Sequence, residues 1–327
     1  MEELLNISGL RTYFFTEAGV VKAVDGITFN VSKGETLGLV GESGSGKSVT
    51  ALSALRIVPR PGRIIGGKVT FEGRDLLPLD EEEMRKLRGA KMAMVFQDPM
   101  SSLNPLFTIE NQLKEIIILH KKVTKEQARD EARKLLELVG IPEAERRLGS
   151  YPHEMSGGMK QRIAIARALI AQPTLLFADE PTTNLDVTIQ AQVLDLMRDL
   201  KRRLNMTVVL ITHDMGIIAE MTERVTVVYA GQVFETAKTR DIFFNPRHPY
   251  TEALLAAVPR LDRRKHLVSV PGNIPNLVDP PGGCRFNPRC PYAQDICAQK
   301  VPELEEVEPG HYVACHRWKE LQLKGVS

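Results

Sequence analysis

Residues 37–48 constrain the fold of this chain more than any other stretch. An apolar run, LGLV (37–40), leads directly into GESGSGKS (41–48), which fits the glycine, four residues, Gly-Lys-Ser spacing of a phosphate-binding loop. Glycines permit a tight turn in which successive backbone N–H groups point inward and form a site for an anion. A helix expected to begin near Val49 adds the positive end of its dipole. The stretch therefore predicts the strand, loop and helix of an α/β nucleotide-binding fold.

The polar side chains of this loop predict what it binds. Lys47 is expected to reach the β- and γ-phosphates of a nucleotide, and the Ser48 hydroxyl is expected to bind Mg²⁺. A flexible Gly/Ser turn is the alternative, but such a turn needs neither the preceding strand nor the lysine. The other residues expected to surround the phosphates are Gly41, Ser43, Gly44, Ser45, Gly46 and Val49.

A pair of carboxylates predicts the catalytic part of the nucleotide site. The apolar stretch LLFA (175–178) is followed by two carboxylates, Asp179 and Glu180. Asp179 at the strand tip suits the surroundings of Mg²⁺, and Glu180 is placed to polarise an attacking water. A helix N-cap is the alternative for such a pair, but a phosphate loop elsewhere in the chain favours the catalytic interpretation. The chain lacks both the guanine-reading Asn/Thr-Lys-x-Asp pattern and G-x-G-x-x-G, so ATP is the predicted ligand.

Bulk composition bounds the class of protein. The 327 residues allow one large domain with a smaller one, or two domains, and 43% hydrophobic with 26% charged residues is typical of a soluble globular protein. A net charge of +2 carries no strong electrostatic signature of nucleic-acid binding. The acidic start lacks the features of a signal peptide, and no apolar run approaches a transmembrane length. These features predict a cytosolic chain, which can still sit on a membrane through a protein partner.

Hydrophobic patterning predicts the order of the remaining elements. Two short buried strands flank a helix at about 187–204, which indicates a parallel βαβ unit. The pattern from about 108 to 172 is helical, and after Pro246 the chain becomes rich in proline and glycine. Further strands are expected at 4–7, 20–31, 36–40, 67–76 and 90–98, with a closing hairpin at 224–237.

The segment EMSGGMKQRIAIARALI (154–170) predicts a second anion site. Ser156 opens a helix, and a serine there is normally only a cap. The two glycines that follow, Gly157 and Gly158, cost helix stability and leave backbone N–H groups exposed. Such a site has a use if it completes a phosphate site across a dimer interface.

With these motifs in order, the sequence resembles the ATP-binding subunits of ABC transporters. The matching motifs are the Walker A loop (41–48), the Q-loop glutamine Gln97 in FQDP, the signature (156–158), the Walker B pair (179–180) and the switch histidine His213 in ITHD. The resemblance implies a RecA-like core with an antiparallel β subdomain and a helical subdomain. It also implies a head-to-tail dimer, in which each ATP lies between one subunit's Walker A loop and the other's signature.

The resemblance further implies roles for single residues. Gln97 would touch Mg²⁺ and the attacking water and sense the membrane subunit, while His213 would contact the γ-phosphate. An aromatic residue upstream of the loop would stack on adenine, with Phe14 the first choice and Tyr13 the next. The signature departs from the commonest form because Met159 replaces a polar side chain.

Longer segments resemble the dipeptide and oligopeptide importer branch, which also includes nickel and glutathione importers. These are FQDPMSSLNP, DEPTTNLDVTIQAQ, NPRHPYTEALL and the final cysteine segment. The branch implies two membrane permease subunits docking near residues 98–112, a second related ATPase in a heterodimer, and an external peptide-binding protein. The chain would be a peripheral subunit at the cytoplasmic face of the membrane. The rival is a soluble ABC ATPase acting on nucleic acid, which the single cassette and near-neutral charge disfavour.

All the cysteines lie late in the chain, in a segment too rich in Pro and Gly for a core of its own. A reducing cytosol does not suit disulfides, and a metal staple is favoured over free thiols. The spacing lacks the paired C-x₂₋₄-C of most zinc sites, although zinc stays an alternative, with His311 or His316 as a possible replacement ligand. The resemblance implies a 4Fe–4S cluster on Cys284, Cys290, Cys297 and Cys315. The expected domains are 1–255, the ATPase with a helical subdomain at about 100–170, and 256–327, the cysteine module.

Overall fold

The computed structural model describes residues 2–258, 270 and 272–326, and the chain forms two compact units. The first unit comprises Met1–Leu79 with Leu210–Ser327, and the second comprises Asp80–Val209. Strand β8 (Thr207–Thr212) carries the chain from the second unit into the first. Within the described residues, no helix is long and apolar enough to cross a membrane.

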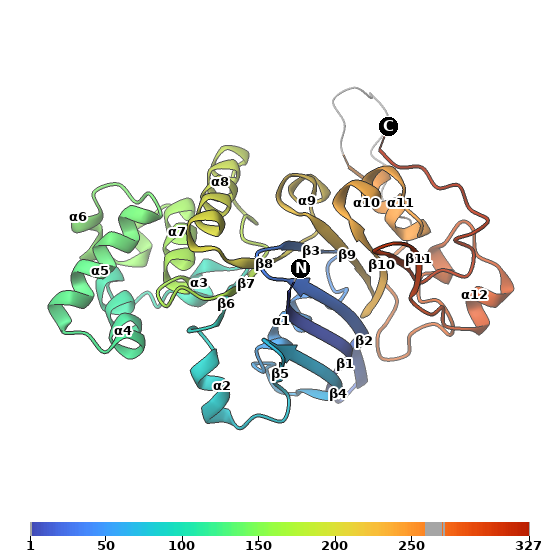
Figure 1. Cartoon of the computed structure of the whole chain (residues 1–327), viewed down its shortest axis with the longest axis horizontal. Coiled ribbons are helices and arrows are strands. Elements are labelled where there is room, and N and C mark those ends of the chain that lie inside the picture. The colour runs from blue at the N-terminus through green and yellow to red at the C-terminus, as the bar shows by residue number, and fades with distance from the viewer. Residues whose placement is uncertain (1, 259–269, 271, 327) are drawn as a thin grey trace. The chain divides into compact units, whose positions relative to one another are not determined.

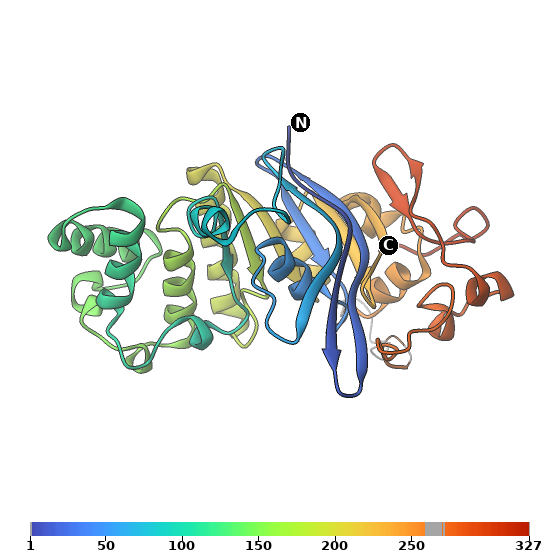
Figure 2. The same cartoon turned by 90° about the horizontal axis from the view of Figure 1, so that it is seen from below.

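An antiparallel sheet occupies the N-terminal part of the first unit. Its strand order is β2-β1-β4-β5. The first two strands form a long curved hairpin, which Figure 2 shows in blue. The apolar side chains of Leu5 and Ile7 are fully buried, because alternate residues of a strand face the same side. Leu10 is also buried, after a register shift between Ile7 and Leu10. The bounds are β1 (Glu3–Thr16), β2 (Gly19–Ser32), β4 (Gly62–Phe71) and β5 (Arg74–Asp75).

A second group of strands in the first unit positions the phosphate loop. It runs in the order β11-β12-β10-β9-β3, with β3 parallel to β9 and the other neighbours antiparallel. Every residue of β3 is buried, as its unbroken apolar sequence predicts. The bounds are β3 (Thr36–Val40), β9 (Arg224–Tyr229), β10 (Gln232–Lys238), β11 (Glu305–Glu308) and β12 (His311–Val313). The helices of this unit that exceed one short turn are α1 (Lys47–Ala54), α9 (Met215–Met221), α10 (Thr239–Phe244) and α11 (Pro249–Ala256).

The C-terminal segment is built into the core of the first unit. Its strand β12 pairs with β10. Residues 272–286 lead to the 3₁₀ turn η2 (Asn287–Arg289), which is followed by the short helix α12 (Asp295–Gln299). Figure 1 shows this segment in red beside α10, α11 and β10. The buried aromatic rings that it shares with the rest of the unit are Tyr229, Phe234, Tyr250 and Phe286, and buried Cys284 and Cys297 lie in the same cluster.

The second unit combines a parallel strand pair with helices. Strands β6 (Met92–Val95) and β7 (Leu175–Asp179) are parallel neighbours, as the buried strands of the sequence predict. The helices are α2 (Glu81–Leu87), α3 (Pro99–Ser102), α4 (Ile109–Lys121), α5 (Lys125–Leu138), α6 (Ala144–Leu148), α7 (Gly157–Ala168) and α8 (Val187–Leu204), with a 3₁₀ turn η1 (Pro152–Glu154).

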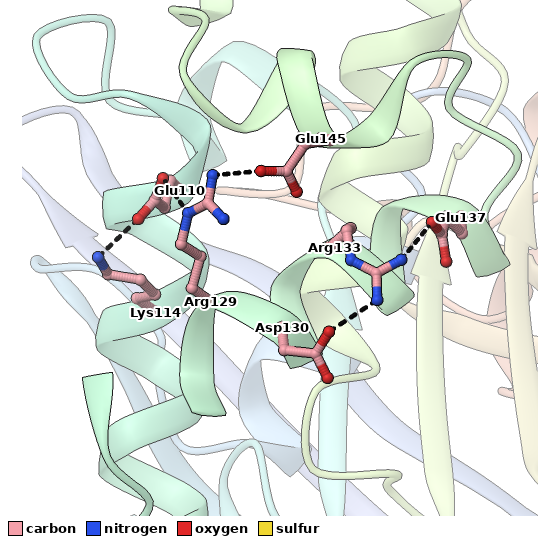
Figure 3. Close-up of polar contacts among 7 residues, drawn as sticks. All are labelled: Glu110, Lys114, Arg129, Asp130, Arg133, Glu137 and Glu145. Atoms are coloured by element: carbon pink, nitrogen blue, oxygen red, sulfur yellow. Dashed lines mark hydrogen bonds and ion pairs between the residues drawn. The ribbon is translucent and has the colours of Figure 1, made fainter. Parts of the chain in front are cut away.

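Helix α5 illustrates how the helical part holds together. A capping box at Thr124 begins it, and Ala128, Ala132 and Leu136 form its buried face at a spacing of four. On the exposed side, the Arg129 guanidinium donates to the carboxylates of Glu110 on α4 and Glu145 on α6 (Figure 3). Exposed ion pairs are weak singly, but this one links three helices, so it favours a single arrangement of α4, α5 and α6.

Candidate functional site

The phosphate loop lies between β3 and α1, where the sequence places it. Gly41 and Gly46 have φ of 155° and 102°, values that favour glycine. A Cβ at Gly41 would lie 2.0 Å from the Val228 carbonyl oxygen, and one at Gly46 would lie 2.3 Å from the Ala23 carbonyl oxygen. Both positions therefore require glycine for two reasons, the backbone angle and the close approach of a neighbouring strand.

Lys47 is buried and its ammonium turns back over the loop. Its Nζ donates to the carbonyl oxygens of Gly41 and Glu42 at 2.7 and 2.8 Å, and to the Ser45 hydroxyl at 3.3 Å. The side chain is only 5% exposed as a residue, so the loop itself supplies the acceptors that replace water. This holds a positive charge at the face of the loop where the backbone turn predicts a phosphate.

The loop is supported by the turn that connects β9 and β10. The Gly231 N–H donates to the Ser45 carbonyl at 2.8 Å, and the Gly231 carbonyl accepts from the Asp25 N–H at 2.8 Å. Ser48 lies one residue into α1, whose N-cap is Gly46. Val49 continues the same helix, in agreement with the helix predicted there.

The two candidate adenine platforms, Tyr13 and Phe14, are neighbours in β1 and therefore face opposite sides of the sheet. The Tyr13 hydroxyl donates to Asp25 at 2.6 Å, and burial together with this bond raises the pKa of Tyr13 to about 12. The Phe14 ring lies over Gly62, where a Cβ would meet its edge at 2.8 Å. Only one of these rings can face a given nucleotide, and the choice of Phe14 stays a prediction.

His213 is exposed and directly follows β8. The next residue, Asp214, caps α9 by accepting from the N–H groups of Gly216 and Ile217 at 2.7 and 3.3 Å. Because the cap fixes the start of α9, the histidine is presented at a defined position at the carboxyl end of a strand.

In the second unit, the structure brings two of the predicted catalytic residues together. The Gln97 amide donates to the Glu180 carboxylate, Nε2 to Oε2, at 2.8 Å, and the Thr183 hydroxyl donates to the same oxygen at 2.8 Å. Glu180 has φ of 45°, which is uncommon for a residue with a side chain. Asp179 ends β7 and is 5% exposed. The carboxylate predicted to act on water is thus oriented by two donors, one of which the sequence analysis missed.

The signature residues begin α7. The Ser156 hydroxyl caps the helix by accepting from the Met159 N–H at 3.3 Å. Gly157 is exposed, whereas Gly158 is buried against α8, where a Cβ would meet Ile189 at 2.5 Å. The second glycine is therefore required for helix packing as well, a reason that spacing alone does not reveal.

The cysteine segment forms a second candidate site. All four cysteines carry free thiols and line one cavity of about 20 Å³. Burial raises the pKa of Cys284 to about 12 and that of Cys315 to about 11. In the part of the chain that the structure describes, no group of three or more His, Cys, Asp or Glu side chains is arranged to hold a metal ion.

The histidines near the cysteines are engaged elsewhere. Buried His311 pairs with Glu235 through Nε2 and Oε1 at 2.7 Å. His316 lines the cavity, and its Nε2 lies 2.8 Å from the Lys300 carbonyl oxygen. The cysteines thus line one cavity without the arrangement of a metal site in the described residues, and His311 has a structural partner.

A glycine loop with a buried lysine after one strand, and paired carboxylates after another, define a P-loop nucleoside triphosphatase. The ABC transporter family model matches residues 24–183, and the model described as the C-terminal region of oligopeptide/dipeptide transporters matches residues 234–297. The chain belongs to the family of ABC transporter ATP-binding proteins, and it is an ATP-hydrolysing transporter subunit.

Relatives cover the chain almost from end to end. The probable peptide ABC transporter ATP-binding protein y4tR of Sinorhizobium fredii is 50% identical over 97% of this chain and 96% of its own length. The oligopeptide transport ATP-binding protein OppD of Escherichia coli is 49% identical over 97% of this chain and 94% of its own. A solved post-hydrolysis dimer of the ATP-binding cassette MJ0796, bound to ADP and Pi, has a TM-score of 0.65 at 28% identity and covers 72% of this chain and 99% of that one.

Proposed function

We propose that this chain hydrolyses ATP to drive the import of dipeptides or oligopeptides. The observation that carries the proposal is the match of residues 234–297 to the C-terminal region of oligopeptide/dipeptide transporters. Described residues of that region, such as Tyr250 and Phe286, belong to the core of the first unit. The relatives are similar to this chain over nearly their full length, and both are named as peptide transport proteins. This favours peptide import over the function of a nucleic-acid ATPase. Import of nickel or another small solute is the alternative within the same branch.

In this function, the chain's own residues divide the work of hydrolysis. Lys47 and the loop N–H groups bind the phosphates, and Glu180 orients and polarises the water. Ser48, Gln97 and Asp179 would hold Mg²⁺. The hydrogen bond from Gln97 to Glu180 supports a shared role for these two side chains. Magnesium, when bound, neutralises charge on the transferred phosphoryl group. Completion of the site requires the signature of a facing ATPase subunit, while Ser156, Gly157 and Gly158 of this chain complete the site of that subunit.

Partners of this subunit follow from the same assignment. We place two membrane permeases, a second related ATPase and an external peptide-binding protein in the complex, with this chain peripheral at the cytoplasmic face. A cavity of about 530 Å³ on the second unit supports permease docking, since most of its lining residues belong to the predicted docking segment 98–112 and Leu106 in that segment is 80% exposed. Its lining residues are Ser102, Leu103, Asn104, Pro105, Phe107, Gln112, Glu115 and Arg167.

Capture of the intact complex tests this function. The full-length chain, tagged and expressed in its own cells, is expected to co-purify with membrane permeases and a second ATPase. After reconstitution into proteoliposomes, peptides of two to five residues with the binding protein should stimulate ATP hydrolysis several-fold. Stimulation by nickel ions instead would reassign the solute, and co-purification with nucleic acid would overturn the transporter assignment.

A 4Fe–4S cluster on the four cysteines is proposed for the second site. The support is their convergence on a single cavity. A zinc ion on the same four sulfurs is the alternative, and the arrangement of the side chains in the described residues favours neither metal group over the other. Such a cluster, when bound, supplies a redox centre and four covalent links within the segment.

Anaerobic purification tests the cluster. The protein is expected to be brown, with about four iron atoms and four acid-labile sulfides per chain. Cys290→Ser should lose most of this iron, whereas Ser8→Ala, an exposed change elsewhere in the unit, should retain it. Colourless protein containing one zinc per chain would replace the cluster with the zinc alternative.

A further inference from the structure

Two arginines of the C-terminal segment have buried side chains, and one of them, Arg289, reaches back to the phosphate loop. Arg285 directly follows Cys284 and Arg289 directly precedes Cys290. The side chain of each arginine is 5% exposed. Buried guanidinium groups are costly unless they are fully paired, so their partners are informative.

Arg289 forms a two-pronged pair with Glu42, the second residue of the phosphate loop. Its Nη1 donates to Oε2 at 2.7 Å and its Nη2 donates to Oε1 at 3.0 Å. The guanidinium also donates to the Tyr229 hydroxyl at 3.1 Å and lies over the Tyr229 and Phe286 rings at 5.6 and 5.9 Å. Such bidentate, charge-assisted contacts are among the strongest and most directional between side chains.

Glu42 connects this arginine to the lysine of the loop. Its side chain is held by Arg289, while its carbonyl oxygen accepts from Lys47 Nζ at 2.8 Å. Its N–H donates to the hydroxyl of Tyr250, on α11, at 2.9 Å. The first residues of the loop are therefore fixed from outside by a side chain of η2 and a side chain of α11.

Arg285 connects the C-terminal segment to β2 and to the turn between β9 and β10. It donates to the Ala230 carbonyl and to the Asp25 carboxylate. The residue after Ala230 is Gly231, whose N–H donates to the Ser45 carbonyl at 2.8 Å. Arg285 is thus linked to the phosphate loop only indirectly, through the turn whose Gly231 contacts Ser45.

We propose that Arg289 is a positioning residue for ATP binding, which acts through Glu42 to hold the phosphate loop and Lys47 in the form that receives the triphosphate. The proposal rests on the proposed ATP binding at this loop. It makes nucleotide affinity depend on the order of the cysteine segment. By linkage, nucleotide binding must stabilise that segment by the same factor.

Calorimetry of Mg·ATP binding to the full-length chain tests the proposal. Arg289→Gln and Glu42→Gln are each expected to weaken binding about tenfold, because each removes the charge-assisted pair, and Glu42→Gln does so with the side-chain shape almost unchanged. The double variant should be no weaker than either single variant. Arg289→Lys should lie between, since an ammonium can keep one contact but not the fork. In steady-state assays KM should rise about tenfold while kcat stays within about twofold.

A matched control separates positioning from general stability. Arg247→Gln breaks another arginine–glutamate pair of the first unit, with Glu308, away from the phosphate loop. This variant should bind Mg·ATP as the parent does. If Arg289→Gln does not fold, Glu42→Gln carries the test, because Glu42 lies outside the cysteine segment and is 29% exposed as a side chain.

Hydrogen exchange supplies an independent measurement. Mg·ATP should slow exchange at residues 284–297 at least threefold in the parent and leave it unchanged in Glu42→Gln. Affinities within twofold of the parent in both single variants, or additive losses in the double variant, would overturn the proposal. A parent chain that does not bind Mg·ATP at all would instead reject the proposed function.

Discussion

Glu180→Gln is expected to lower ATP turnover at least about a hundredfold while Mg·ATP affinity stays within about threefold. The amide cannot polarise water as a carboxylate does, but it retains the shape that Gln97 and Thr183 contact. Phosphate release measured with the assembled ATPase gives the turnover, and calorimetry gives the affinity.

Glu143→Gln is the matched control for this change. Glu143 is another glutamate of the second unit with positive φ, 51°, and it lies at the start of α6. The control should hydrolyse ATP at the parental rate, because only the local ion pair with Arg146 is affected. Equal turnover in Glu180→Gln and the parent would remove Glu180 from the catalytic role and leave it as a residue that orders the turn.

Lys47→Ala is expected to weaken Mg·ATP binding at least about a hundredfold, because the loop loses the one side chain whose charge faces the phosphates. The ammonium already sits on three oxygen acceptors of its own loop, so the variant also leaves two carbonyls and a hydroxyl without that donor. Fluorescence titration with a nucleotide analogue gives the affinity, and thermal unfolding reports whether the loop change alters stability.

Lys33→Ala serves as the control for the lysine. Lys33 belongs to the same unit, and its side chain is 52% exposed beside Glu2. Its removal should change neither nucleotide affinity nor stability beyond a few tenths of a kcal/mol. If Lys47→Ala binds Mg·ATP as tightly as Lys33→Ala, the loop does not grip the phosphates through this side chain.

The local parts of the fold are well predicted by local patterns. The loop glycines, the helical pattern from about 108 to 172, which includes α5, and the hairpin at 224–237 are all confirmed. Strand β1 is longer than the apolar pattern at 4–7 predicts, because pairing with β2 and β4 holds polar residues such as Arg11 in the strand. The loop-like C-terminal region also contains strands that its Pro- and Gly-rich composition conceals.

Contacts between distant residues are what local patterns do not reveal. Glu42 and Arg289 are 247 positions apart, and nothing in either neighbourhood indicates the other. The same applies to Gly158, whose packing against Ile189 depends on how two helices cross. The contact of Thr183 with Glu180 could have been predicted from the sequence, since a hydroxyl three residues later in a turn can fold back onto that side chain.

The pairing of β12 with β10 has a consequence for solubility. An uncovered strand edge invites another chain to add to it, and β10 is rich in residues that favour such growth. Strand β12 of the C-terminal hairpin occupies that edge, and β11 becomes the outermost strand of the sheet. The sequence of β11, EEVE, presents acidic side chains outward. Like charges on that outermost strand repel a second copy, so a chain cut before residue 300 would expose β10 and tend to aggregate.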